Sequence, residues 1–336
     1  MINEANHGFF SSGTYIRMSQ IPKYTFEPLC SDREIAECES EFFDREHYHT
    51  IIDSDADGYK ANGEILFRFR KAVIDPELCE QAVESLRSVS MVKHDNRGAS
   101  AGVLDWKRMP KYVGGWVKSD KFRTYYTRKS TNKVSKHHIS NLTPSNLVGY
   151  YERRDRNDTL GRPCRMTAFT KRETEKWQRT IPIITRIDQL FQQLYPERHA
   201  KQLARAKLTP EVTIAETCFS TVTTNYSWRT ACHRDRGDYE QGFGTLAVLR
   251  DPKNPNEYDG CYLGFPQYGV CINVRNTDFL LMDVHEWHAN TEFEPLQDPI
   301  PYRRFTTRDY ANHWHLNRLA IVCYLRRNMI NCQTKN

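Results

Sequence analysis

The order of the predicted elements is what most constrains the fold of this 336-residue chain. Apolar residues recur at helical spacing over 76–89 and again through 177–194. From Val212 onward, short β-rich runs follow one another, separated by Gly, Pro and Asn. Helices followed by many short strands predict an α+β protein whose core is a double-stranded β-helix (a jelly-roll or cupin-like scaffold), buttressed by N-terminal helices.

The same order predicts the domain organisation. We expect residues 1–60 to form an N-terminal extension and residues 61–336 to form a single domain. Within that domain, helical support is expected over about 61–210 and the β-helix core over about 211–330.

Four local patterns predict details. Ile65–Arg70 is typical of a strand, and Thr170–Glu173 has the form of a capping box that opens a helix. Pro182 is expected to kink or split the helical region that follows. Asp53–Glu64 has the spacing of a calcium loop, but flanking helices are poorly indicated, so an acidic loop is the alternative.

The chemistry of the chain is indicated by His233 and Asp235, which on a strand project to the same side. One imidazole and one carboxylate can bind a single metal ion. A second histidine would complete a 2-His-1-carboxylate triad, which leaves positions open on Fe(II). His285 and His288 compete for this role, and their odd spacing places them on opposite faces of a regular strand. We take His288 as the ligand, with His285 as the alternative.

Such a site also needs a buried arginine, because a guanidinium can hold the far carboxylate of 2-oxoglutarate through two parallel hydrogen bonds. Arg318 opens the apolar run 319–325, which predicts a buried strand, and is therefore favoured. Arg303 and Arg304 are rivals in an irregular, proline-flanked stretch.

Long motifs carry a resemblance to a known family. They are Thr223–Asn225, Arg229–Asp238, Gly242–Leu246, Gly260–Leu263 and Leu281–Asn290, continued upstream by Asn96–Gly98 and Cys164–Thr170 and downstream from Arg318 to Met329. In these motifs the chain resembles the TET/JBP family of 2-oxoglutarate- and Fe(II)-dependent nucleic-acid-base dioxygenases, especially phage and fungal relatives. By that resemblance His233, Asp235 and His288 would bind iron, and Arg318 would bind 2-oxoglutarate.

The resemblance implies an oxidoreductase that uses Fe(II), 2-oxoglutarate and O2 to hydroxylate the 5-methyl group of 5-methylcytosine or thymine in DNA. The target base is expected to flip out of the duplex into the site. Asn225 could donate a hydrogen bond to 2-oxoglutarate, and Asp238 and Trp287 are pocket candidates. Two alternatives stay open: the same chemistry on a protein side chain or small molecule, and a non-catalytic nucleic-acid-binding module.

The segment from Trp106 to Lys136 points to the partner, because Lys and Arg residues alternate there with Trp, Tyr and Phe. Basic groups can neutralise phosphates while aromatic rings stack on bases, so we expect DNA as the partner. The alternative is a solvated basic face whose aromatic residues turn into the core.

The chain shows no run of about 18 apolar residues and no secretory signal pattern, so neither a membrane span nor secretion is predicted. Its ten cysteines are scattered without a close CxxC pair. We expect reduced thiols, no structural zinc site and an intracellular location in cytoplasm or nucleus. The oligomeric state stays open.

Overall fold

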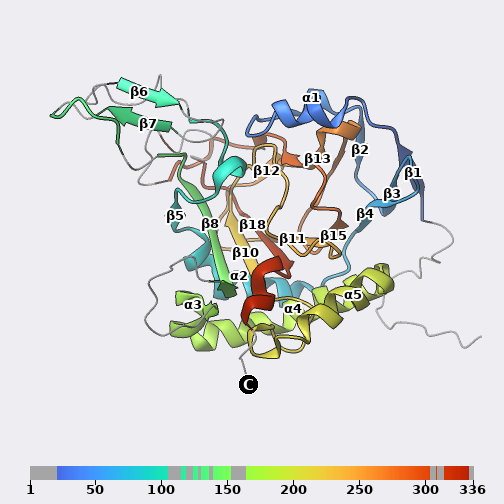
Figure 1. Cartoon of the computed structure of the whole chain (residues 1–336). Helices are drawn as coiled ribbons and strands as arrows, with labels where there is room; N and C mark the ends of the chain where they lie inside the picture. Colours follow the sequence, from blue (N-terminus) through green and yellow to red (C-terminus); the bar gives the residue numbers. More distant parts are fainter. Residues whose placement is uncertain are drawn as a thin grey trace, which may run out of the picture.

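The computed structural model describes residues 21–104, 115–118, 124–127, 130–135, 139–152, 164–302, 308 and 314–332. In this part of the chain, a large sheet lies between a layer of helices and a smaller sheet (Figure 1). The predicted mixture of helices and strands around a large sheet is confirmed.

The large sheet joins strands from both ends of the chain. Among the described residues it has ten strands, in the spatial order β1 (Lys23–Phe26), β3 (Ala56–Lys60), β4 (Ile65–Arg70), β15 (Phe279–Met282), β11 (Gly244–Arg250), β18 (Arg318–Tyr324), β10 (Thr221–Tyr226), β8 (Thr143–Glu152) and β5 (Lys93–His94), with β9 (Cys164–Met166) paired to β8. Its centre is antiparallel, with β18 paired to β11 on one side and to β10 on the other. The strand predicted at 65–70 is confirmed as β4.

The smaller sheet has four strands in the described part of the chain: β16 (Ala289–Asn290), β13 (Leu263–Phe265), β14 (Val270–Ile272) and β2 (Thr50–Ile52). Two further strand pairs stand apart from it, β12 (Tyr258–Gly260) with β17 (Phe293–Pro295), and β6 (Gly115–Lys118) with β7 (Thr124–Thr127).

The α-helices in the described residues are α1 (Asp32–Glu37), α2 (Pro76–Ser90), α3 (Ala168–Arg172), α4 (Thr174–Leu194) and α5 (Pro196–Ala206). Helices α2 and α4 cover one face of the large sheet, and apolar side chains such as Leu86, Ile184 and Phe191 are fully buried between the helices and the sheet. The helix expected over 76–89 is confirmed as α2, and the Asp75 carboxylate accepts a hydrogen bond from the Glu77 amide at its start.

A second core lies between the two sheets, because successive side chains of a strand point to opposite faces. In β11, Ala247 and Leu249 face the helices, whereas Leu246 and Val248 face the smaller sheet. Ala320 of β18 also belongs to this second core. The near-continuous apolar character of the central strands therefore reflects burial on both faces.

The described part of the predicted N-terminal extension contributes strands to both sheets. Strands β1 and β3 lie at one edge of the large sheet, and β2 pairs in parallel with β14. Neither interpretation of Asp53–Glu64, the calcium loop or the acidic loop, describes the structure, because the middle of this segment is strand β3. The Asp57 carboxylate forms a buried ion pair with Arg70 at 2.8 Å, and Glu64 pairs with Lys60 at 2.8 Å.

The predicted capping box is wrong, and of the two outcomes expected at Pro182 the split is wrong, whereas the kink stays a prediction. Helix α3 begins after Thr167, whose hydroxyl accepts a hydrogen bond from the Thr170 amide, so the capping position lies three residues before the predicted one. Glu173 stands between α3 and α4, at the N-cap position of α4, where its side chain makes no capping hydrogen bond. Pro182 does not split α4, which continues through it. The apolar face on either side of Pro182 is buried against the sheet, and this burial outweighs the lost backbone hydrogen bond.

The expectation of fully reduced thiols is wrong for one pair. Cys164 of β9 and Cys332 near the end of the chain form a disulfide with their Cα atoms 5.5 Å apart. The two residues are 168 positions apart in sequence, and only the fold brings them together. The other eight cysteines, all of them among the described residues, keep their thiols outside any disulfide. Among the described residues, no helix is long and apolar enough to cross a membrane.

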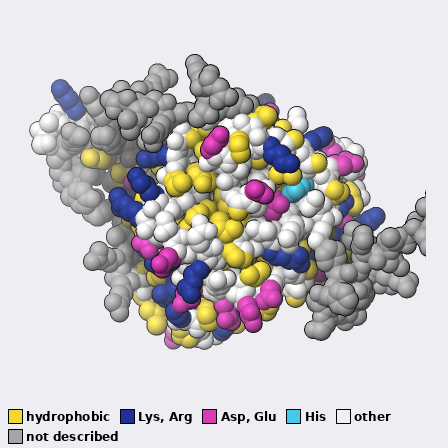
Figure 2. Space-filling model, turned by 90° about the horizontal axis from the view of Figure 1, so that it is seen from below, with side chains coloured by type: hydrophobic (Ala, Val, Ile, Leu, Met, Phe, Trp, Pro, Cys, Tyr) yellow, Lys and Arg dark blue, Asp and Glu magenta, His cyan; other side chains and the backbone are white. Residues whose placement is uncertain are grey.

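The outer surface seen from below carries charges of both signs with apolar side chains between them (Figure 2). Within the helix layer, the exposed side chains of Arg179 in α4 and Glu84 in α2 form an ion pair at 3.6 Å. Such a mixed surface is typical of solvent-facing helices, whose apolar faces are turned towards the sheet.

Phe67 of β4 tests the second core. It is fully buried, and its ring lies 6.3 Å from that of Phe265 in the facing sheet. We expect Phe67→Ala to lower the free energy of unfolding by about 3–5 kcal/mol, since it leaves a cavity between the sheets. Urea unfolding measures this. Leu296→Ala is the control, because Leu296 is 67% exposed and its removal should change stability by less than about 0.5 kcal/mol.

Candidate metal centre and its cavity

The structure brings together the three residues that were predicted as metal ligands. Asp235 Oδ1 lies 3.6 Å from His233 Nε2, and Asp235 Oδ2 lies 3.8 Å from His288 Nε2. One ligand atom from each of the three residues lies within 4.8 Å of the others. The two imidazole rings are 4.3 Å apart between centroids.

Backbone hydrogen bonds hold these residues in place. His233 and His288 form an isolated antiparallel bridge in which each amide donates to the other's carbonyl at 3.0 Å. The Asp235 amide donates to the Val284 carbonyl at 3.0 Å. The premise that His285 and His288 lie on one regular strand is wrong, because β15 ends at Met282 and the next residues form a turn. Gly244 lets this turn approach the sheet, since a Cβ there would overlap the Val284 side chain.

Each imidazole is oriented by a main-chain carbonyl. The Ala231 oxygen lies 2.7 Å from His233 Nδ1, and the Glu286 oxygen lies 2.9 Å from His288 Nδ1. A carbonyl can only accept, so both Nδ1 atoms carry the proton and both Nε2 atoms keep a free lone pair. This is the tautomer that a metal ligand requires.

Burial keeps His233 neutral. Its pKa is lowered from the ordinary value of 6.5 to about 4, first by burial and then by the neighbouring His288, although Asp235 acts in the opposite direction. A neutral imidazole needs no deprotonation before it binds a cation.

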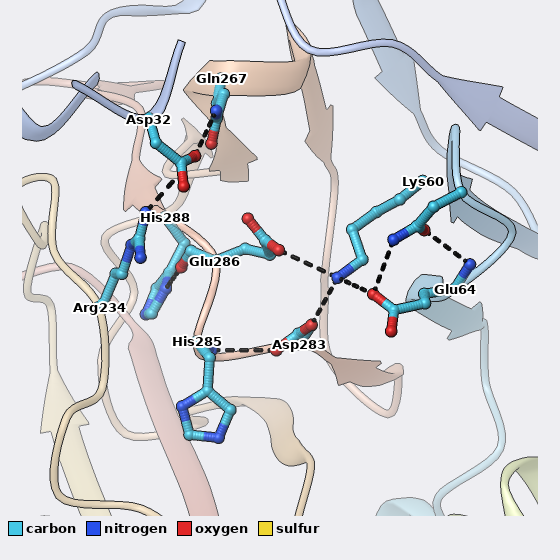
Figure 3. Close-up of polar contacts among 10 residues, drawn as sticks. Asp32, Lys60, Glu64, Arg234, Gln267, Asp283, His285, Glu286 and His288 are labelled. Carbon is cyan, nitrogen blue, oxygen red and sulfur yellow. Dashed lines mark hydrogen bonds and ion pairs between the residues drawn. The ribbon is translucent and has the colours of Figure 1, made fainter. Parts of the chain in front are cut away.

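The competing histidine lies elsewhere. The His285 ring points away from His288 (Figure 3), and its Nε2 lies 3.3 Å from the Tyr239 carbonyl. The His285 amide donates to Asp283 at 3.1 Å. In this structure His288, and not His285, stands beside His233 and Asp235.

A cavity of about 320 Å³ opens next to the three residues. Arg318 and Asn225, both predicted to contact 2-oxoglutarate, line it from β18 and β10. Arg318 is 3% exposed, and its Nε has no hydrogen-bond partner. Asn225 is 8% exposed and accepts a hydrogen bond from the Ser145 hydroxyl at its Oδ1, so its amide group remains to donate. Arg303 and Arg304, the rivals of Arg318, lie outside the described residues.

Asp238 and Trp287, the two residues predicted to line the pocket, differ in their positions. Asp238 lines the cavity, and its pKa is raised well above the ordinary value by burial and by Asp235. Trp287 does not fulfil the prediction: it packs in a small apolar cluster with Ile35, Cys232 and Ala289.

Sequence reasoning assigned no role to Arg97, Tyr324 and Arg326, which also line the cavity. Arg326 forms an ion pair with Glu152, whereas the buried Nε of Arg97 has no hydrogen-bond partner. Arg97 lies in one of the motifs that carry the family resemblance, and this was the available signal. Tyr324 and Arg326 lie in another of these motifs, the one from Arg318 to Met329, so they carried the same signal.

The donor set fits Fe(II). Two imidazole nitrogens and one carboxylate are the ligands of a facial triad, and this number leaves coordination positions open. Both Nδ1 atoms are already hydrogen bonded, so the free Nε2 atoms are the ones that can bind a metal. The buried guanidinium of Arg318, whose Nε has no hydrogen-bond partner, suits an anion in the same cavity.

A second group with metal-ligand chemistry, Asp188, His199 and Cys218, is present among the described residues. Its groups satisfy one another, because Asp188 Oδ1 accepts hydrogen bonds from His199 Nε2 at 3.1 Å and from the Cys218 amide at 2.9 Å. Burial and Asp188 raise the pKa of the Cys218 thiol well above its ordinary value. The network therefore connects α4 and α5 to the chain that leads into β10.

Most of the basic and aromatic segment from Trp106 to Lys136 lies outside the described residues. The part that is described includes the two-stranded hairpin of β6 and β7, at the left of Figure 1. The predicted contact of this segment with DNA stays a prediction.

The family model Tet_JBP, described as the oxygenase domain of the 2OGFeDO superfamily, matches residues 146–327, which is more than half of the chain. Thymine dioxygenase JBP1 of Trypanosoma brucei brucei is 32% identical over 211 residues, which cover 62% of this chain and 24% of that protein. Thymine dioxygenase JBP1-B of Trypanosoma cruzi (strain CL Brener) is 31% identical over 236 residues, covering 70% of this chain and 25% of that protein.

The chain thus spans about a quarter of the length of these two curated relatives. Among solved structures, NgTET1 in complex with 5mC DNA matches with a TM-score of 0.42 and 10% sequence identity. That match covers 91% of this chain and 94% of the other.

The choice of the distal ligand can be tested by metal binding. We expect His288→Ala to weaken binding of Fe(II), or of Mn(II) as an air-stable probe, by more than about tenfold, because even the loss of a hydrogen-bond partner of a ligand costs 10–100-fold. His285→Ala should bind the metal as the wild type does. Isothermal titration measures both, and the opposite ranking would make His285 the ligand.

The metal-free protein should lose stability in mild acid. The unfolded chain protonates His233 below about pH 6.5, whereas the folded protein does so only near pH 4, so the free energy of unfolding falls as the pH drops between these values. The loss from pH 7 to pH 5 should be about 2 kcal/mol. Urea unfolding of the wild type and of His233→Asn isolates this contribution, and equal losses in both proteins would contradict it.

Proposed function

The chain belongs to the Tet_JBP family, the oxygenase domain of the 2OGFeDO superfamily, and from this premise we propose that it hydroxylates the 5-methyl group of a pyrimidine base in DNA. The observation that carries the proposal is one cavity that is lined by His233, Asp235, His288 and the buried guanidinium of Arg318, whose Nε has no hydrogen-bond partner. The superfamily implies Fe(II), 2-oxoglutarate and O2 as the reagents.

The proposed scaffold is the double-stranded β-helix predicted from the sequence. Its support is the second core, where the large and the small sheet face each other with the cavity among their side chains. We keep residues 61–336 as the proposed oxygenase domain, with the strands of residues 21–60 added at the edges of both sheets.

His233, Asp235 and His288 would hold the iron, which supplies, with 2-oxoglutarate and O2, an oxidant able to remove hydrogen from a methyl group. The residues themselves orient the reagents. Arg318 would hold the far carboxylate of 2-oxoglutarate by two parallel hydrogen bonds, and the Asn225 amide could donate a further one. Apolar side chains in the cavity wall, Leu246, Leu263, Met282, Ala320 and Val322, exclude water from the reacting groups.

The proposed substrate is thymine or 5-methylcytosine, which both carry a methyl group at C5. Two of the similar proteins are named thymine dioxygenases, and the solved structure contains 5mC DNA. The cavity lies between packed sheets, so a base must leave the duplex to reach it. The basic and aromatic segment from Trp106 to Lys136 is the proposed DNA contact, and a DNA substrate implies an intracellular place of action.

A direct assay tests the function. The purified protein is incubated with Fe(II), 2-oxoglutarate and duplexes that contain thymine or 5-methylcytosine, and succinate and oxidised nucleosides are measured by mass spectrometry. We expect both products from the wild type and neither from His233→Ala. Succinate without oxidised nucleosides would keep the oxygenase and exclude DNA as the substrate. The absence of both products would overturn the proposal.

The role of Arg318 yields a separate prediction. Arg318→Ala should raise the KM for 2-oxoglutarate by about 100-fold or more, because it removes two charge-assisted hydrogen bonds worth about 1.5–3 kcal/mol each. Arg250→Ala is the matched control, since Arg250 pairs with Arg318 across β11 and β18 but has a half-exposed side chain. Initial rates at varied 2-oxoglutarate measure both. Equal KM values for Arg318→Ala and the wild type would place the anchor elsewhere.

A further inference from the structure

Lys60, at the end of β3, lies at the centre of a cluster of three carboxylates (Figure 3). Its Nζ is 2.8 Å from Glu64, 3.2 Å from Asp283 and 3.0 Å from Glu286. Glu64 is its neighbour in the β3–β4 hairpin and is more than half exposed, whereas Asp283 and Glu286 are more than 220 residues away in sequence and are mostly buried. The ammonium group therefore connects the N-terminal hairpin to the turn after β15.

Hydrogen bonds connect that turn, directly or through His288, to all three proposed metal ligands. The Val284 carbonyl accepts the Asp235 amide, and the Glu286 carbonyl accepts Nδ1 of His288. His288 in turn forms the backbone bridge with His233. A shift of the turn would consequently move each of the three ligand side chains.

Charge makes the position of the turn depend on Lys60. Asp283 and Glu286 are like charges, both in contact with one ammonium group and each with a side chain less than a fifth exposed. In the described part of the chain, no other cation forms an ion pair with either carboxylate. Removing the ammonium would leave two carboxylates close together in a partly buried place, where their repulsion is poorly screened.

The beginning and the end of the turn are held differently. At its start, the Asp283 amide donates to the Leu66 carbonyl at 2.9 Å, so backbone pairing with β4 already anchors it. Near its end, Glu286 supplies the carbonyl that orients His288, and its own side chain is held by Lys60. Lys60 therefore acts on the part of the turn that sets the distal imidazole.

We propose that Lys60 is a positioning residue of the metal centre: by holding Glu286 and Asp283 it fixes the turn that aims His288 and Asp235. The inference rests on the proposed iron site. It also gives the N-terminal strands a part in the chemistry, because Lys60 lies outside residues 146–327, which the family model matches.

Metal affinity tests the proposal without turnover. Mn(II) is titrated into the full metal-free chain, and its binding is measured by calorimetry. Binding that remains in His233→Ala is assigned to other sites and subtracted from the binding of each protein. We expect Lys60→Met to weaken Mn(II) binding by about tenfold, the lower end of the effect of losing an outer partner of a metal ligand. Lys60→Arg keeps the charge and should stay close to the wild type.

Arg70→Met is the matched control for a general loss of stability. Arg70 of β4 forms a similar buried ion pair, at 2.8 Å, but its partner Asp57 lies in β3 and not in the ligand turn. We expect both variants to lower the thermal midpoint of the metal-free protein, and only Lys60→Met to weaken Mn(II) binding. Equal weakening in the two variants would overturn the proposal.

A second variant separates charge repulsion from lost packing. In Lys60→Met with Glu286→Gln, one of the two opposed carboxylates is neutral, so Mn(II) affinity should recover most of the tenfold loss. Wild-type affinity in Lys60→Met, or no recovery in the double variant, would overturn the positioning role. If His233→Ala binds Mn(II) as the wild type does, the proposed iron site fails and the inference falls with it.

Discussion

The two hydrogen bonds between the backbones of His233 and His288 are the constraint on which the rest of the site depends. They join two loops that are far apart in sequence, so the imidazoles meet without either residue lying in a long strand. A short bridge is weak by itself, and it persists because its surroundings are held: Ser40 and Glu41 pair with Cys232 next to it, and Ala289 continues into β16. The metal centre is thus built on loop ends that two packed sheets fix in place.

Alternation along the strands explains why the cavity lies where it does. In β18, Leu319, Ile321 and Cys323 face the helices, so Arg318, Ala320 and Val322 face the space between the sheets. In β10 the same rule places Thr223 and Asn225 on the cavity side. Two antiparallel neighbours therefore supply one wall, and a one-residue slip in their register would turn Arg318 into the helix layer.

Much of the candidate site was predictable from the sequence, and the predictions that failed did so for physical reasons. The spacing of His233 and Asp235, and an arginine at the start of an apolar run, depend only on local order, so both were found. The choice of His288 was reached from a strand geometry that the turn at 283–287 does not have. The disulfide of Cys164, the strand at Ala56–Lys60 and the place of Trp287 could not be predicted, because each depends on partners far away in the sequence.

Arg318 shows how the fold leaves room for function. A buried guanidinium whose Nε makes no hydrogen bond within the protein costs free energy unless a bound molecule supplies an acceptor. The carboxylate of 2-oxoglutarate that we propose to bind Arg318 would supply acceptors to this guanidinium. The neutral His233 acts in the same sense, since it is held ready for a cation. Metal and carboxylate should therefore each stabilise the folded chain, because both bind groups that only the folded chain brings together.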